Sequence, residues 1–383
     1  MFKTALCDIS DKDKIKKLWI DLFDDSENFV DWFFENRFHP KYSCCTYDDD
    51  ILVSAMQSVP MNLKIREISI PSTMICGVST KKEYRNKGFM HKTFSHYMKQ
   101  MNDKGIILTT LKAVSIPTYH SVSHLSCTTS AYVTLSKNDA DYYKNIFDNN
   151  PINKVTKTQI IDVFSNINKL NECYCKFTDL YSAIALRNEK EFLLKMHDYY
   201  SDNAQCMAVI QSGIIKGYCI YFKQEGIYCE EFVVTDKDTA DCLIYGLLSQ
   251  NKNYEKFEIK TSKTVSEYIN SSNINIKDQN SMGIVNVQKL LNAMFGKMHK
   301  DYVIEVEDAF IQNNNGIFLL NGTKTQKPAH LKISSGQLLR LICGYDSLDN
   351  LIRNNNISIY DKAACEDLSK MLPVCDCFII DEY

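Results

Sequence analysis

The sequence lacks the features that mark several common protein classes. Lys and Arg number 44 against 47 Asp and Glu, which gives a formal net charge of −3, and no sustained basic stripe runs along the chain. Nucleic acid is therefore not an expected partner. No apolar run is long enough to span a bilayer, and the first residues lack the apolar core of a signal peptide. We therefore expect a cytoplasmic protein without a membrane span.

The cysteines lack the spacing that would define a metal or redox site. Fifteen are present, an odd number, and none belongs to a Cys-x-x-Cys pair. Cys44 and Cys45 are adjacent, and two other pairs are separated by a single residue. Such spacing suits neither a zinc ribbon nor a dithiol motif. We expect reduced, mostly buried thiols and no metal ion.

Two glycine-rich phosphate signatures are also missing, but a different junction is present at residues 78–90. The chain has neither a Walker loop nor the three glycines of a dinucleotide fingerprint. At the junction an apolar run ends in a polar turn, and an apolar helix face follows. Such a turn aims unpaired backbone N–H groups and the positive end of a helix dipole at one point. Gly88 lets a ligand approach the backbone, and Arg85, Lys87 and Lys92 supply positive charge.

This turn resembles the acetyl-CoA signature of the GNAT acetyltransferases, Arg/Gln-x-x-Gly-x-Gly/Ala, and in particular that of their Eis-like branch. The matching residues are Arg85, Asn86, Lys87, Gly88, Phe89 and Met90. Met90 departs from the small residue that usually ends the signature. The resemblance implies that these six residues bind pyrophosphate, and that Val78 and Thr80 offer backbone groups to the pantetheine arm and the thioester. The alternative is an ordinary strand–turn–helix connection that binds nothing.

A chain of 383 residues exceeds one ordinary domain. The resemblance implies an α/β fold with α+β mixed sheets in three domains. Residues 1–135 would form the catalytic GNAT domain, 136–280 a degenerate GNAT-like copy without the signature, and 281–383 a sterol-carrier-like α+β domain. In the last domain the apolar residues at helical spacing around Leu338 and Leu351 belong either to an ordinary core or to an apolar tunnel.

Local patterns predict the elements of these domains. Residues 11–36 favour two helices interrupted at residues 24–26, and strands are expected at 51–59, 62–70 and 74–80, with a break at Pro60 and Met61. A strand at 132–135 is expected to close the first domain, and a helical stretch is expected at 177–198.

A proton donor is predicted at Tyr119. Eis-like enzymes have a pattern like Pro-Phe-Tyr-x-x-Phe-Gly-Tyr here, of which this chain keeps Pro117 and Tyr119 but not the second half. The resemblance implies that Tyr119 gives a proton to the departing CoA thiolate, and a phenol of pKa ~10 is protonated at neutral pH. The alternative is a packed tyrosine whose hydroxyl bonds the backbone. His120 and His124 either relay a proton or are surface histidines.

The C-terminus is the second candidate catalytic element. An apolar run leads into Asp381, Glu382 and Tyr383, which fits a tail that inserts into the protein. The resemblance implies that the carboxylate of Tyr383 acts as base or orienting group. Asp381 and Glu382, with Asp24 and Asp25 of the helical lid, are the candidate groups for a cationic substrate. The alternatives are a frayed tail, solvated carboxylates, and a solvated turn with a helix N-cap at residues 24–25.

The sequence thus predicts an N-acetyltransferase that moves an acetyl group from acetyl-CoA to a primary amine, either a small molecule or a lysine side chain. The resemblance implies a homo-oligomer, namely a hexamer. The competing hypothesis is a non-catalytic scaffold or carrier that binds an apolar ligand in the C-terminal domain.

Overall fold

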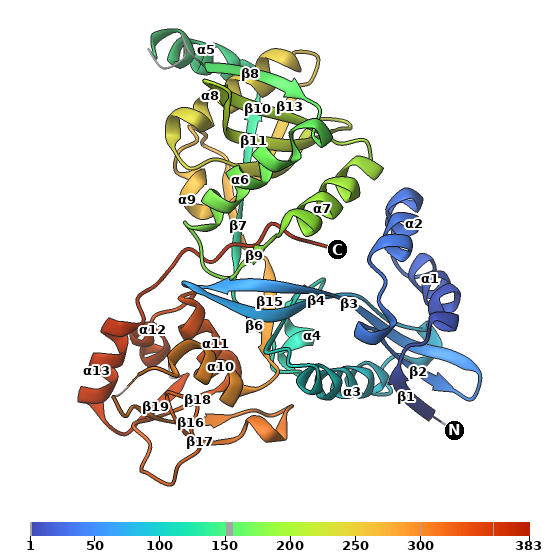
Figure 1. Cartoon of the computed structure of the whole chain (residues 1–383), viewed down its shortest axis with the longest axis vertical. Coiled ribbons are helices and arrows are strands. Elements are labelled where there is room, and N and C mark those ends of the chain that lie inside the picture. Colours follow the sequence, from blue (N-terminus) through green and yellow to red (C-terminus); the bar gives the residue numbers. More distant parts are fainter. Residues whose placement is uncertain (1, 151–155, 299, 355) are drawn as a thin grey trace. The chain divides into compact units, whose positions relative to one another are not determined.

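The computed structural model describes residues 2–150, 156–298, 300–354 and 356–383. The chain divides into two compact units (Figure 1). Unit 1 comprises Met1–Thr128, Gln279–Cys377 and Asp381–Tyr383, and unit 2 comprises Thr129–Asp278 and Phe378–Ile380. The two outer segments of the expected three-domain division thus share one unit, and that division itself stays a prediction.

The N-terminal part of unit 1 is a mixed sheet in the order β1-β2-β3-β4-β5-β15-β6, in which β4 and β5 are parallel and the other pairs are antiparallel. Its strands are β1 (Phe2–Leu6), β2 (Cys44–Asp48), β3 (Ile51–Ile65), β4 (Ile68–Thr80), β5 (Leu108–Lys112), β6 (Leu125–Ser126) and β15 (Asn280–Ile284). Its helices are α1 (Lys12–Ile20), α2 (Glu27–Asn36), α3 (Phe89–Asp103) and α4 (Ile116–His120). The mixed sheets confirm the expected α/β fold class.

Two apolar clusters cover opposite faces of this sheet. One contains Cys45 and the buried side chains of α1 and α2, and the other contains Cys44 and the buried side chains of α3. Adjacent residues of a strand point to opposite faces, so this pair of cysteines separates the two cores. The faces are called the α1–α2 face and the α3 face below.

The central hairpin is longer than expected, and the predicted break at Pro60 was wrong. β3 continues through Pro60, the chain turns at Arg66 (φ 53°), and β4 continues through Pro71. Pro60 pairs with Thr73, beyond the last β2 partner of β3 at Met56. No β2 ladder bond therefore needs an N–H from Pro60.

The C-terminal part of unit 1 forms a second sheet in the order β17-β16-β18-β19. Its elements are α10 (Val287–Phe295), β16 (Val303–Glu307), β17 (Gly316–Leu319), β18 (Leu331–Ser334), α11 (Ser335–Cys343), α12 (Leu348–Arg353), β19 (Ile357–Ile359) and α13 (Lys362–Met371). Leu338 and Leu351 are buried, as ordinary core residues are. Arg66 reaches the end of α11 and donates hydrogen bonds to the carbonyls of Ile342 (2.8 Å) and Pro373 (2.8 Å). A cation at a helix C-terminus is favourable.

Unit 2 contains a sheet in the order β14-β7-β13-β12-β11-β10-β8. The strands of this sheet are β7 (Thr129–Ser136), β8 (Thr156–Ile161), β10 (Gln205–Gln211), β11 (Ile214–Lys223), β12 (Ile227–Val233), β13 (Lys256–Thr261) and β14 (Ile274–Asp278). Unit 2 also contains the short strand β9 (Ile184–Leu186), which lies outside this sheet. Its helices are α5 (Ala140–Asn149), α6 (Ile167–Thr178), α7 (Glu189–Ser201), α8 (Lys237–Gln250) and α9 (Lys263–Ser266). As in unit 1, a long antiparallel pair leads to a helix and then to a parallel strand.

Two further expectations were wrong. The strand expected to close the first domain is β7, which pairs with β13 and β14 in unit 2, while β15 takes the place beside β5 in unit 1. The helical stretch expected at 177–198 is divided between α6 and α7, because α6 ends at Thr178 and Asn188 caps a new helix.

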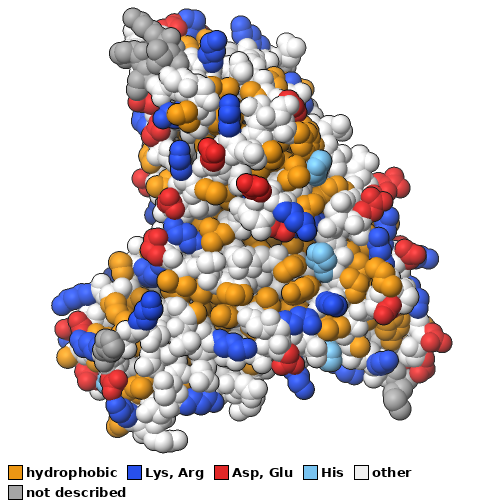
Figure 2. Space-filling model, viewed as in Figure 1, with side chains coloured by type: hydrophobic (Ala, Val, Ile, Leu, Met, Phe, Trp, Pro, Cys, Tyr) orange, Lys and Arg blue, Asp and Glu red, His pale blue; other side chains and the backbone are white. Residues whose placement is uncertain are grey.

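In the part of the chain that the structure describes, no helix is both long and apolar enough to cross a bilayer. Figure 2 shows acidic and basic side chains interspersed over the visible face.

Candidate active site

A bulge in β4 shapes the site on unit 1. One extra residue of β4 is inserted between Cys76 and Ser79 relative to β3. Gly77 lies in this bulge with φ 56°, and a Cβ there would lie 2.2 Å from the Trp19 ring. Glycine is therefore required for both reasons, backbone conformation and space. Gly77 was not among the predicted site residues, although a glycine inside a strand pattern is itself a signal of a bulge.

Beyond the start of this bulge, β4 and β5 separate. Their parallel pairing runs from Ser72 with Leu108 to Ile75 with Leu111, and residues 76–80 of β4 continue past it. Ligands of open α/β sheets bind at the carboxyl ends of parallel strands. Val78 and Thr80, both half-buried, lie on this separated segment. Their backbone groups are the ones that the sequence analysis assigned to the pantetheine arm.

The turn after β4 leaves the start of α3 uncapped. Asn86 (φ 61°) and Gly88 (φ 80°) are left-handed, and α3 begins at Phe89. No side chain bonds the N–H groups of the first turn of α3 in the described structure. These N–H groups therefore remain available to an anion.

The six signature residues surround this helix start. Phe89 is buried and Met90 half-buried, whereas the rest are exposed, namely Arg85, Asn86, Lys87 and Gly88. Arg85 Nε donates a 3.2 Å hydrogen bond to the Thr80 carbonyl, which holds the guanidinium beside the turn. The turn thus combines open backbone donors with two exposed cations.

Tyr119 lies on α4 and packs on the α3 face. Its ring centroid is 6.5 Å from that of Phe94, and Val78 and Met90 pack against the same cluster. Burial raises the pKa of the Tyr119 phenol. No group in the described structure hydrogen-bonds this hydroxyl, so the alternative of a backbone-bonded phenol does not hold. A protonated phenol with a free O–H can donate to a ligand.

The two histidines beside Tyr119 differ. His120 is exposed, whereas His124 is fully buried and is not the surface histidine considered above. The Nε2 of His124 lies 2.7 Å from Thr109 Oγ1, and its Nδ1 lies 2.8 Å from the Val122 carbonyl. Both ring nitrogens are thus engaged, and burial lowers the pKa of His124 to about 4. His124 has a structural role, because neither nitrogen is free to relay a proton.

The shift at His124 predicts a loss of stability in mild acid. Because the pKa is about 4 in the folded protein and about 6.5 in the unfolded chain, the unfolded state binds more protons between these values. Lowering the pH from 7 to 5 should therefore cost about 2 kcal/mol of unfolding free energy through this residue. Urea titrations at both pH values measure the loss, which should be smaller by that amount in His124→Gln. An equal pH dependence in both proteins contradicts the assignment.

The C-terminal tail is anchored in unit 1. Glu382 forms an ion pair with Lys112, the last residue of β5, and accepts a hydrogen bond from Gln279. The Tyr383 hydroxyl accepts a 2.8 Å hydrogen bond from Arg37, whose guanidinium lies 5.0 Å from the ring centroid. The tail is therefore not frayed, and Lys112 neutralises Glu382 at the end where β5 parts from β4.

The remaining candidate carboxylates have different surroundings. Asp381 is buried, and Asp24 and Asp25 are exposed. Asp25 accepts a 2.7 Å hydrogen bond from the indole N–H of Trp19, the residue whose ring fills the space beside Gly77. The N-cap that was considered for residues 24–25 is instead Ser26, which accepts from Phe29 N at 3.0 Å.

The structure thus brings the predicted residues together in two groups. Val78, Met90 and Tyr119 pack on the α3 face, whereas Tyr383 packs on the α1–α2 face against the cluster that contains Trp19. The sequence analysis also missed Arg37 and Lys112, the partners of the tail. No local pattern indicates them, because each lies hundreds of residues from its partner in the chain.

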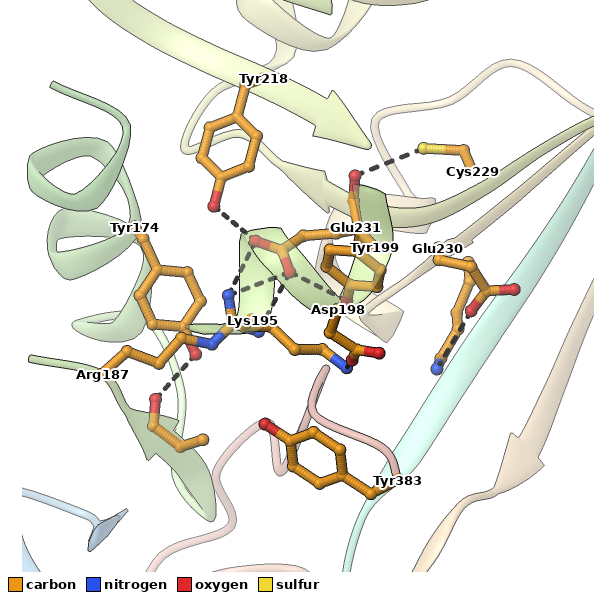
Figure 3. Close-up of polar contacts among 12 residues, drawn as sticks. Tyr174, Arg187, Lys195, Asp198, Tyr199, Tyr218, Cys229, Glu230, Glu231 and Tyr383 are labelled. Carbon is orange, nitrogen blue, oxygen red and sulfur yellow. Dashed lines mark hydrogen bonds and ion pairs between the residues drawn. The ribbon is translucent and has the colours of Figure 1, made fainter. Parts of the chain in front are cut away.

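In unit 2, protein side chains occupy the positions that correspond to the open helix start of unit 1. The helix after its central strand is α8, and Asp236 caps it by accepting from Thr239 N at 2.8 Å. A carboxylate therefore takes the position that an anion would need. Figure 3 shows Glu231 of β12 bound by Arg187 and by the hydroxyls of Tyr199 and Tyr218. The expected loss of an acetyl-CoA site from this segment stays a prediction, and this geometry supports it.

Two family models match the chain. Residues 6–123 match the acetyltransferase (GNAT) domain, and residues 287–376 match the sterol carrier protein domain. None of the curated proteins matches the chain.

Solved structures share the fold over the whole chain. A probable N-acyltransferase from Enterococcus faecalis superimposes with a TM-score of 0.83 at 16% identity, and a GCN5-related N-acetyltransferase from Anabaena variabilis with 0.82 at 16%. Eis1 from Mycobacterium abscessus superimposes with 0.77 at 14% identity. All three comparisons cover 100% of both chains. The chain is therefore an acyltransferase with an N-terminal acetyltransferase (GNAT) domain and a C-terminal sterol carrier protein domain, in the fold it shares with Eis1.

Proposed function

We propose that unit 1 transfers an acetyl group from acetyl-CoA to a primary amine. The observation that carries this proposal is the separation of β4 from β5 directly before an uncapped helix start. The separated strand offers backbone groups to an extended thioester arm, and the turn at Arg85 to Gly88 offers N–H groups and cations to a pyrophosphate. An arm and its phosphates would thus be bound by one continuous stretch of chain.

In this proposal the amine nitrogen attacks the thioester carbonyl, and the C–S bond then breaks. The departing thiolate takes the proton of Tyr119, whose phenol is kept protonated by burial and has no other hydrogen-bond partner in the described structure. The amine proton leaves to the C-terminal carboxylate of Tyr383, directly or through water. Exchange with solvent then removes this proton from the carboxylate and returns one to the Tyr119 phenolate. The tail contacts support this role because they fix Tyr383 through Arg37.

The acceptor in this proposal is a primary amine, either of a small molecule or of a lysine side chain. It arrives as a cation and loses one proton to solvent before the neutral amine attacks. Asp24, Asp25, Asp381 and Glu382 remain the proposed acidic groups around it. Asp24 is the best placed of them, because it is exposed and has no partner in the described structure, whereas Asp25 and Glu382 already bind protein groups.

The proposal includes a cytoplasmic location, where the fifteen free thiols would stay reduced, and a hexamer. The transfer itself uses no metal ion, and no nucleic acid is proposed as a partner.

Calorimetry with acetyl-CoA tests the proposal. We expect micromolar binding by the wild type and at least tenfold weaker binding by Arg85→Glu, since a carboxylate beside the turn repels phosphate; tenfold corresponds to about 1.4 kcal/mol. Lys104→Glu, at the other end of α3, is the matched control and should bind normally.

Titrations with acetyl-CoA and with a fatty acid distinguish this proposal from the carrier hypothesis. A wild type that binds a fatty acid but not acetyl-CoA would instead support a carrier that uses the C-terminal domain. A panel of amines in a thiol-release assay then identifies the acceptor class.

A further inference from the structure

Three side chains with metal-binding atoms meet at the N-terminal edge of unit 1. Cys7 directly follows β1, Cys45 lies on β2, and Asp11 ends the 3-10 helix Ile9–Asp11 that leads into α1. The two sulfurs and a carboxylate oxygen all lie within 4.8 Å of one another. Cys45 Sγ is 3.9 Å from Asp11 Oδ2. Antiparallel pairing of β1 with β2 brings Cys7 near Cys45, and no local spacing marks this pair.

The separation of Cys45 Sγ from Asp11 Oδ2 is close to the one that a tetrahedral cation requires. Bonds of about 2.3 Å to sulfur and about 2.0 Å to oxygen place two sulfurs about 3.8 Å apart and a sulfur and an oxygen about 3.5 Å apart. Cys45 and Asp11 need to approach by only a few tenths of an ångström. Two thiolates with one carboxylate favour Zn²⁺ over the harder Mg²⁺ or Ca²⁺, which prefer oxygen ligands.

Two hydrogen bonds orient the Asp11 carboxylate, as is usual for a metal ligand. Tyr47 donates a 2.6 Å hydrogen bond to Asp11 Oδ1, and the backbone N–H of Asp8 donates a 2.7 Å hydrogen bond to Oδ2. Such partners orient a ligand and tune its basicity. Cys7 and Cys45 are only 8% and 2% exposed, whereas Asp11 is half-buried, so an ion can enter from the side of the carboxylate.

The charges of the site are also compatible with a divalent cation. Two thiolates and one carboxylate around Zn²⁺ leave one net negative charge. The Lys14 ammonium lies 5.2 Å from the centroid of the Tyr47 ring, and Tyr47 is the residue that donates a hydrogen bond to Asp11. The ammonium partly offsets the net negative charge of the site.

We propose that Cys7, Asp11 and Cys45 bind one Zn²⁺, with water as the fourth ligand. The ion joins β1, β2 and the start of α1, and so fixes the helix pair of the α1–α2 face onto the edge of the sheet. The role of the ion is to tie these three segments together, since each ligand lies on a different one.

Metal titration of the full-length protein tests this site. The chain is freed of metal with a chelator under reducing conditions and titrated with Co²⁺, then with Zn²⁺. We expect one Co²⁺ per chain, with a thiolate-to-cobalt charge-transfer band and the strong visible bands of four-coordinate cobalt, all removed by one equivalent of Zn²⁺. Zn²⁺ should also raise the Tm of the wild type.

Matched variants locate the ion. Cys45→Ser and Asp11→Asn should each weaken Co²⁺ binding at least tenfold, and Zn²⁺ should not raise the Tm of Asp11→Asn. Cys44→Ser, on the opposite face of β2, and Cys76→Ser, in the same apolar cluster, should keep the stoichiometry and the spectrum.

Two results overturn the proposal. One is a wild type without a thiolate band at one equivalent of Co²⁺, and the other is a band that persists in the Cys7→Ser/Cys45→Ser double variant. Asp11→Asn keeps both thiols and is close in shape to the wild type, so it remains decisive if a cysteine variant does not fold.

Discussion

Replacing Tyr119 by Phe should lower kcat by about 10²- to 10⁴-fold while leaving the affinity for acetyl-CoA within about twofold, because the proposed role of the lost group is general acid catalysis. The removed hydroxyl has no hydrogen-bond partner in the described structure, so its loss leaves no protein group unsatisfied. The ring that packs with Phe94 is retained. The effect should therefore fall on the protonation of the thiolate and not on binding or folding.

Thiol release at saturating amine measures kcat for this variant, and calorimetry measures the affinity for acetyl-CoA. Tyr42→Phe is the control, because Tyr42 packs against the same apolar cluster and has no proposed catalytic role. An unchanged kcat in Tyr119→Phe removes this residue from the mechanism. A parallel loss of acetyl-CoA affinity indicates a binding role in place of proton donation.

The parts of the site that the sequence predicted are those in which local chain chemistry fixes the geometry. Residues 85–88 form a turn because Asn86 and Gly88 adopt left-handed conformations, and such residues are visible in the sequence. The helix with an early proline at Pro117 places Tyr119 in the same way. These predictions needed no knowledge of distant residues.

The parts that could not be predicted depend on partners far along the chain. Lys112 and Glu382 are 270 residues apart. The strand predicted to close the first domain was β7, but β15 pairs with β5 there. Both strands are apolar enough to fit beside β5, so tertiary pairing decides between them. Pro60 misled the prediction because its cost depends on whether a neighbouring strand needs its N–H, which the sequence does not state.

The buried ion pair of unit 2 was missed for the same reason, although the helix opening after Arg187 was noted as a resemblance. Arg187 and Glu231 have side chains that are 2% and 0% exposed, and three hydrogen bonds of 3.0 Å join them. The Arg187 guanidinium also lies 4.3 Å from the centroid of the Tyr174 ring. Every partner comes from a different element, so no local pattern marks the cluster.

Arg187→Met should lower the unfolding free energy of unit 2 by about 3–5 kcal/mol, because it leaves the Glu231 carboxylate buried without a counter-charge. The double variant Arg187→Met/Glu231→Gln should be more stable than this single variant. It carries no orphan charge. Tyr199 and Tyr218 donate to different oxygens of Glu231, so in Gln the amide oxygen accepts from one hydroxyl and the amide N–H donates to the other. Lys144→Met breaks an exposed ion pair with Asp148 in the same unit and is the control, with no measurable loss expected.

Two optical probes assign the loss to a unit. Trp19 and Trp32 are the only tryptophans of the chain and both belong to unit 1, so tryptophan fluorescence follows the unfolding of unit 1. Far-ultraviolet circular dichroism follows both units. In urea, Arg187→Met should therefore shift the dichroism midpoint to lower denaturant. An unfolding free energy within about 1 kcal/mol of the wild type, or a double variant as unstable as the single one, contradicts the idea that an unpaired buried charge dominates. The single variant thus measures the free-energy cost of an unpaired buried carboxylate, and the double variant measures the net contribution of the ion pair. This net contribution is small because desolvation of two ions offsets most of their attraction.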